Sequence, residues 1–130
     1  MKYLLDTNIV IAIKNRHPQV LAELTKHKNK DIAMSSIVYF ELVFGAFKSA
    51  KIQQNLDDLH RMHFEILEFN QNDGFYAGQI RSNLKAKGTP IGAYDTLIAG
   101  QALANDLILI TDNVKKFERV DGLKVENWLR

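Results

Sequence analysis

Short apolar runs alternate with longer helical stretches along the whole chain, and this alternation restricts the fold more than any other feature. The strand-like runs are residues 3–5, 32–34, 65–69, 107–110 and 123–126. Helical periodicity occupies, roughly, residues 19–27, 37–48, 52–62, 73–87 and 93–104. Such alternation favours a mainly parallel sheet covered by helices on both faces. We therefore predict an α/β fold with three α/β/α layers and a central sheet of about five strands.

The composition suits one ordinary domain. The chain has 130 residues, of which 46% are hydrophobic and 25% charged, and no linker or repeat divides it, so residues 1–130 are expected to form a single domain. No apolar stretch approaches the roughly 18–20 residues of a membrane span, and Asp6 interrupts the N-terminus too early for a signal peptide. Cysteine is absent, which excludes disulfides and thiolate sites. These features favour a cytoplasmic protein.

A carboxylate follows the first apolar run directly. Residues 3–5 lead into Asp6, Thr7 and Asn8. In an open α/β sheet the carboxyl ends of the strands face the ligand crevice, so an acid at this position suits a metal or phosphate site. The alternative is that Asp6 only caps a helix that begins near Ile9, since Asp is a good N-cap residue.

The long apolar run at 107–110 ends in the same way. It is followed by Thr111, Asp112 and Asn113, which supply a hydroxyl, a carboxylate and an amide. A continuous apolar run is typical of a central parallel strand that is buried on both faces. Two strands that end in polar residues would bring those side chains to the same edge of the sheet.

A third acid lies in a helical stretch that is apolar nearly all round. At helical spacing Ile37, Phe40, Phe44 and Phe47 form one stripe, which we expect to face the core, and Glu41 falls inside it. A glutamate is costly to bury unless it is paired or bound to a metal. The alternative is that Glu41 lies at a rim and reaches water.

Asp95 is the fourth acid of interest. It lies in the first turn of a helix that begins near Ala93, where the helix dipole alone would stabilise a carboxylate. Small residues such as Ala99 and Gly100 allow this helix to pack closely against the sheet. We therefore expect Asp95 to face the strand ends.

Basic residues flank these acids, although the net charge is only +2. They include two groups, Arg81, Lys85 and Lys87 before the helix of Asp95, and Lys115, Lys116 and Arg119 after the last long apolar run. Together with the acids they suggest a polyanion held over a metal site. For any one of them, a solvated helix face is the alternative.

These segments together resemble the PIN-domain ribonucleases, and specifically the VapC toxins of bacterial type II toxin–antitoxin systems. The matching motifs, in chain order, are Leu5-Asp6-Thr7-Asn8, Ser35 or Ser36 with Glu41-Leu42, Ile91-Gly92-x-x-Asp95-x-Leu97-Ile98-Ala99, and Thr111-Asp112-Asn113 followed by Phe117-Glu118-Arg119-Val120. The resemblance covers essentially the whole chain, and the motifs keep the family's order and spacing.

The resemblance implies an endoribonuclease that depends on Mg²⁺, with Mn²⁺ as the alternative ion. Asp6 and Asp95 are expected to be direct metal ligands, and Glu41 a ligand or a water-activating partner. The family's frequent fourth acid aligns with Asn113, so the carboxylate that would hold a second metal is replaced by an amide. Residues expected to orient the ligands or position phosphate are Thr7, Asn8, Ser36, Thr111, Asp112 and Asn113. Residues expected to contact the RNA backbone are Arg81, Lys85 and Lys87.

The resemblance also implies partners. A cognate VapB-like antitoxin is expected to dock along the apolar groove of Ile37, Phe40, Phe44 and Phe47; the alternative is that the surplus apolar face only packs against the helix at 52–62. A homodimer is expected, with operator DNA bound only through the antitoxin, and the expected RNA is a tRNA, with the anticodon loop of initiator tRNA as the specific case. The alternative function is a catalytically idle PIN-fold module that binds RNA or a protein. The presence of Asp6, Glu41 and Asp95 together argues against this alternative.

Overall fold

The computed structural model describes all 130 residues, and its centre is a sheet of five parallel strands in the order β3-β2-β1-β4-β5. In this sheet Leu5 pairs with Met34 on one side and with Ile110 on the other, so β1 is the central strand. The strands are β1 Tyr3–Leu5, β2 Ile32–Ser35, β3 Glu65–Leu67, β4 Ile108–Ile110 and β5 Val125–Glu126.

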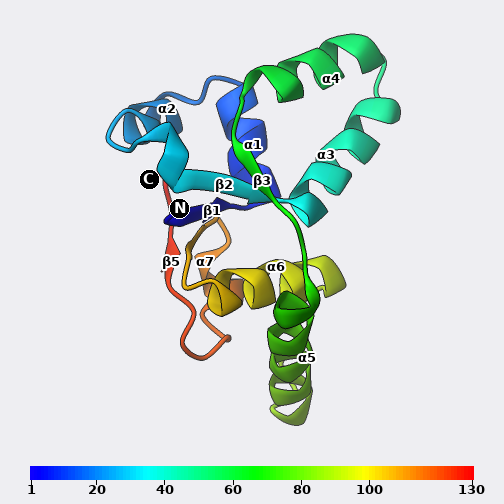
Figure 1. Ribbon diagram of the computed structural model, residues 1–130, viewed down its shortest axis with the longest axis vertical. Helices are drawn as coiled ribbons and strands as arrows, with labels where there is room; N and C mark the ends of the chain where they lie inside the picture. Colours follow the sequence, from blue (N-terminus) through cyan, green and yellow to red (C-terminus); the bar gives the residue numbers. More distant parts are fainter.

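Helices cover both faces of the sheet, which confirms the predicted three-layer α/β/α arrangement (Figure 1). One face carries α1 Thr7–Lys14, α2 Pro18–Leu24, α3 Ser36–Phe47 and α4 Ile52–Arg61, and a 3-10 turn, Asn29–Asp31, leads into β2. The other face carries α5 Gln71–Ala86, α6 Ala93–Ala104 and the short α7 Val114–Phe117. The chain first moves outward from β1 to β3 and then returns to β4 beside β1. The carboxyl ends of β1 and β4 therefore border the ligand crevice of such a sheet.

The core lies on the two faces of β1 and β4. Leu4, Leu5, Leu109 and Ile110 have no exposed surface, as expected for central parallel strands. Polar groups then fix where the helices begin. Asp6 and Ser35 cap α1 and α3 by accepting hydrogen bonds from backbone N–H groups, and Asn70 forms a capping box with Asp73 at the start of α5.

The element boundaries differ from the prediction where short polar signals decide them. The first helix begins at Thr7 rather than near Ile9, because Asp6 caps it. Strand β3 ends at Leu67, not at residue 69, because the chain turns there toward the capping box of α5. The sequence pattern did not predict α7, since its four residues are too few to show periodicity. None of the helices combines the length and apolar character needed to cross a lipid bilayer.

Three of the four residues of the stripe on α3 do not face the core, so the prediction was wrong for them, whereas Ile37 packs against the core. Phe40, Phe44 and Phe47 are 50%, 59% and 59% exposed, whereas Val38 and Ala46 on the same helix are buried. Because α3 is apolar nearly all round, periodicity alone does not identify its buried face. Other side chains of α3 do pack against α4, where Tyr39 Oη lies 2.9 Å from His60 Nε2. The three phenylalanines nevertheless remain exposed.

Candidate functional site

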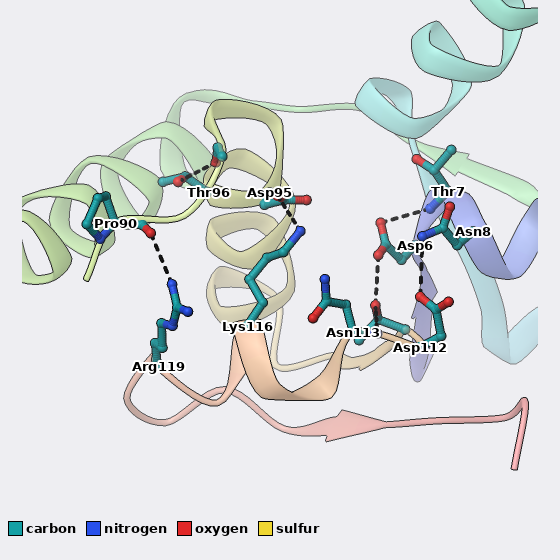
Figure 2. A network of polar contacts seen from close by, with 12 residues as sticks. Asp6, Thr7, Asn8, Pro90, Asp95, Thr96, Asp112, Asn113, Lys116 and Arg119 are labelled. Atoms are coloured by element: carbon teal, nitrogen blue, oxygen red, sulfur yellow. Dashed lines mark hydrogen bonds and ion pairs between the residues drawn. The ribbon is translucent and has the colours of Figure 1, made fainter.

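Asp6 stands at the carboxyl end of β1 and is held from two directions (Figure 2). Its Oδ1 accepts a hydrogen bond from Thr7 N–H at 2.8 Å, and its Oδ2 accepts one from Thr111 Oγ1 at 2.8 Å. The residue is only 7% exposed. Asp6 is therefore the cap of α1 and also a carboxylate fixed at the crevice, so the two interpretations of this residue apply together.

Glu41 reaches the same region from α3. Thr7 Oγ1 donates a hydrogen bond to Glu41 Oε1 at 3.1 Å, so Thr7 contacts both acids, one through its backbone and one through its side chain. Glu41 is half-buried, which corresponds to the rim position rather than to the core. It also lines an open groove of about 270 Å³ together with Val10 and Leu59.

Asp95 projects from the first turn of α6 and is engaged by a lysine. Lys116 Nζ, on α7, donates to Asp95 Oδ2 at 2.9 Å (Figure 2). Gly92 lies close to the same oxygen. A Cβ at position 92 would be only 2.8 Å from Asp95 Oδ2. The absence of a side chain at Gly92 thus leaves room for the carboxylate.

The electrostatics link the three acids. Burial raises the pKa of Asp6, against the lowering effect of the hydrogen bonds from Thr111 and Thr7, and the charge of Asp95 raises it further. Burial also raises the pKa of Glu41, with smaller increases from Asp6 and Asp95 and a lowering effect from Thr7. Lys116 lowers the pKa of both residues. The carboxylates thus repel one another across one crevice, and a cation placed between them would relieve this repulsion.

The donor set fits a hard divalent cation, although the side chains are not gathered around one point. The structure contains no cluster of three or more Asp, Glu or His side chains close enough to ligate a single ion. Each oxygen of Asp6 accepts one hydrogen bond and has a further lone pair for a metal, while Asp95 is drawn toward Lys116. Carboxylates are the ligands that Mg²⁺ and Mn²⁺ prefer. Metal binding at this site would require the acids to approach one another.

The other residues at the two strand ends are brought together as the sequence suggests. Asn8 Nδ2 donates to Asp112 Oδ1 at 3.3 Å, on the exposed side of the crevice. Asn113 N–H donates to Thr111 Oγ1 at 3.1 Å, which orients the hydroxyl that bonds Asp6. Ser36 is different. Its hydroxyl accepts from Phe69 N–H at 3.1 Å and so ties the chain after β3 to the start of α3.

None of the predicted RNA-contacting residues pairs with Asp6, Glu41 or Asp95. Arg81 and Lys85 line a groove of about 670 Å³ between α5 and α6, and Lys87 pairs with Asp121 at 3.2 Å. The cation that contacts the acidic site is Lys116, which sequence reasoning did not single out. Its only signal was membership of the basic segment that follows the last long apolar run.

Comparison with known proteins agrees with the fold and the motifs. The PIN domain family model matches residues 3–123. Ribonuclease VapC2 of Rickettsia felis is 43% identical, with 98% of each chain covered. The tRNA(fMet)-specific endonuclease VapC of Salmonella typhimurium is 37% identical, again with 98% of each chain covered.

Solved structures show the same relationship. The crystal structure of VapBC2 from Rickettsia felis, bound to a DNA fragment from its promoter, superposes with a TM-score of 0.90 at 40% identity and covers 98% of this chain and 99% of that one. DNA-bound VapBC from Salmonella typhimurium gives a TM-score of 0.91 at 36% identity, with 98% of each chain covered. The chain therefore belongs to the PIN-domain family and, within it, to the VapC ribonucleases.

Proposed function

We propose that this protein is the toxin of a type II toxin–antitoxin system and acts as a metal-dependent endoribonuclease. The observation that carries the proposal is that Asp6 after β1, Glu41 on α3 and Asp95 on α6 lie close enough for their charges to act on one another. A module that only bound RNA would gain nothing from three mutually repelling carboxylates facing a phosphate backbone. The names of the relatives, ribonuclease and endonuclease, support the same activity.

Each acid has a proposed role. VapC ribonucleases of the PIN family generally depend on a divalent metal ion, and we propose Mg²⁺, with Mn²⁺ as the alternative. Asp6 and Asp95 would bind the ion directly, and Glu41 would bind it or accept a proton from the attacking water. The bound ion supplies a Lewis acid for in-line attack of water on phosphorus. Asn113 offers an amide where a fourth carboxylate would stand, so we propose one ion rather than two.

The surrounding polar residues would keep the acids in place. Thr111 and the N-terminus of α1 fix both oxygens of Asp6, and the Thr7 hydroxyl fixes Glu41. Asn8 and Asp112 bridge the two strand ends at the exposed rim, where a substrate phosphate would approach. Arg81 and Lys85 would contact the RNA backbone farther along, in the groove between α5 and α6.

The proposed substrate is a tRNA, specifically the anticodon loop of initiator tRNA. Support comes from the name of the Salmonella typhimurium relative, tRNA(fMet)-specific endonuclease. A tRNA loop also presents unstacked single-stranded nucleotides, which a shallow crevice accommodates better than a duplex.

We propose further that a VapB-like antitoxin covers Phe40, Phe44 and Phe47, which α3 exposes next to Glu41. Both solved structures described above are of VapBC bound to DNA, so we propose that the toxin reaches operator DNA only through the antitoxin. We also propose that two copies of the toxin form a homodimer. We propose that residues 1–130 work as one domain, in the cytoplasm.

The test is cleavage of total tRNA by the purified toxin after removal of its antitoxin. We expect Mg²⁺-dependent cleavage, new RNA ends in the anticodon loop of initiator tRNA, and no cleavage after addition of EDTA. Asp6→Asn and Asp95→Asn should lose the activity and remain folded. RNA that stays intact with every divalent ion would support the idle binding module, and full activity in Asp6→Asn would refute the metal site.

A further inference from the structure

A cation of the chain itself already contacts the acidic site. Lys116 Nζ lies 2.9 Å from Asp95 Oδ2, with the two side chains 30% and 25% exposed. The charge of Lys116 also acts on Asp6 and on Glu41, so its field reaches all three acids. The adjacent Lys115, in contrast, is exposed and is not among the charges that shift these two pKa values.

Lys116 engages one oxygen of Asp95, a residue that we propose as a direct metal ligand. A Cβ at position 92 would lie 2.8 Å from the oxygen that Lys116 engages, so no residue other than glycine fits there without a shift of the carboxylate. Figure 2 shows Lys116 reaching from α7 toward Asp95, with Asn113 between this pair and Asp6. The ion pair therefore draws Asp95 toward α7, and the three acids do not converge on one point.

A cleft beside the Asp95 contact offers a second position for the Lys116 ammonium group. Its side chain lines an open cleft of about 360 Å³, and the cleft also contains Asn113, Lys115, Arg119 and the loop at 90–92. Arg119 is held at this cleft by a hydrogen bond to Pro90 O at 3.1 Å. Three basic side chains at one cleft repel one another unless an anion lies among them, and a phosphate of the RNA backbone is such an anion.

We propose that Lys116 is an internal counter-ion that competes with the divalent metal for Asp95 and moves into the adjacent basic cleft when the metal binds. The metal and the RNA in this inference rest on the proposed function. Lys116 acts here as a positioning residue, since it decides where the Asp95 carboxylate stands. Metal binding and phosphate binding then become coupled, because a phosphate in the cleft draws Lys116 away from Asp95 and so strengthens the metal site.

Direct titration with Mn²⁺ tests the inference without RNA. Electron paramagnetic resonance reports free Mn²⁺, so it gives the affinity of wild type, Lys116→Met and Lys115→Met under identical conditions. Lys115→Met is the matched control, since it removes the same formal charge from the same short helix. We expect Lys116→Met to bind Mn²⁺ about tenfold more tightly than wild type, and Lys115→Met to stay within about twofold.

Two further variants make the result unambiguous. Asp95→Asn shows whether the measured Mn²⁺ occupies the acidic site, and Lys116→Gln supplies a second neutral side chain if the methionine variant folds poorly. Equal or weaker binding by the neutral Lys116 variants, together with loss of binding in Asp95→Asn, would overturn the role of Lys116 and leave the metal site intact. Mn²⁺ binding that does not respond to Asp95→Asn in any variant would overturn the metal site, and the inference with it.

Discussion

Thr111 Oγ1 donates a hydrogen bond to Asp6 Oδ2 across 2.8 Å and so joins the ends of β1 and β4 through their side chains. The hydroxyl is itself oriented, because it accepts a hydrogen bond from Asn113 N–H at 3.1 Å. Both Asp6 and Thr111 are buried. The position of the Asp6 carboxylate is therefore fixed by the two strands together and by the start of α1.

Thr111→Val should destabilise the protein and weaken the site. The substitution keeps the shape of the side chain but leaves Asp6 Oδ2 and Asn113 N–H without their partner, at a cost of about 1–3 kcal/mol. Urea unfolding with linear extrapolation measures the change. Thr111→Ser keeps the hydroxyl and should retain most of the stability. A valine variant as stable as wild type would show that the hydrogen bond contributes nothing.

Asp6→Asn should become more stable relative to wild type as the pH rises. Burial raises the pKa of Asp6 in the folded protein, so the folded state holds this proton more tightly than the unfolded chain does. The resulting stabilisation of wild type is present below the unfolded pKa of about 4 and is lost as the pH rises through the folded pKa. The amide of the variant does not titrate, so the difference in unfolding free energy should shift in favour of the variant across that range.

The measurement is a set of urea unfolding curves for both proteins without divalent metal, from about pH 3.5 to about pH 8. A difference that stays constant with pH, or that shifts toward wild type, would contradict the raised pKa. The same ionisation has a second consequence. Metal affinity of wild type should increase as Asp6 and Glu41 lose their protons, because the metal binds carboxylates.

Gly92→Ala should impair the site while the fold remains. The new Cβ would lie 2.8 Å from Asp95 Oδ2, so the carboxylate must move out of the position that the wild-type backbone leaves open for it. The backbone at Gly92 has a φ of −58°, which alanine adopts without strain. We expect RNA cleavage to fall by about tenfold or more, the usual consequence of a misplaced catalytic group.

The matched control is Gly78→Ala. A Cβ at Gly78, in α5, would have no neighbour within 4 Å, and a helical Gly→Ala change commonly stabilises by about 0.5–1 kcal/mol. Circular dichroism checks that both variants are folded. If Gly92→Ala cleaved RNA as fast as wild type, the position of Asp95 beside Gly92 would have no functional importance.

Replacement of Phe44 and Phe47 by glutamine should weaken antitoxin binding by at least about tenfold without unfolding the toxin. Both side chains are 59% exposed, so the core does not depend on them. Phe75→Gln is the control, because Phe75 is 71% exposed but lies on α5, on the opposite face of the sheet. Calorimetric titration with the purified antitoxin measures the affinities. Wild-type affinity in the folded double variant would place the antitoxin elsewhere.

The sequence predicted best what the backbone topology determines. Asp6 and Thr111 each follow a buried run, and parallel strands place their carboxyl ends at one edge, so their proximity follows from the pattern. The buried face of α3 was predicted wrongly, because apolar residues surround the helix and Phe40 and Phe44 gave no contrast with Val38. The role of Lys116 was also missed. A long flexible side chain on a four-residue helix has no local signature, and its contact with Asp95 depends on how α7 packs beside α6.

The hydrogen bond between Asp6 and Thr111 spans 105 positions of the chain, so the site depends on contacts between segments that are synthesised far apart in time. Asp6 and Glu41 are synthesised before Asp95 and Thr111, so the crevice cannot form until residues 1–111 have all been made. A nascent chain that has not yet reached Asp95 therefore has two of the three acids, Asp6 and Glu41, and has no β4 beside β1. Pairing of such distant segments is also a slow step in folding, because the closure of a long loop must precede it. The complete site therefore forms only after this long loop has closed, so RNA cleavage must follow tertiary folding and cannot precede it.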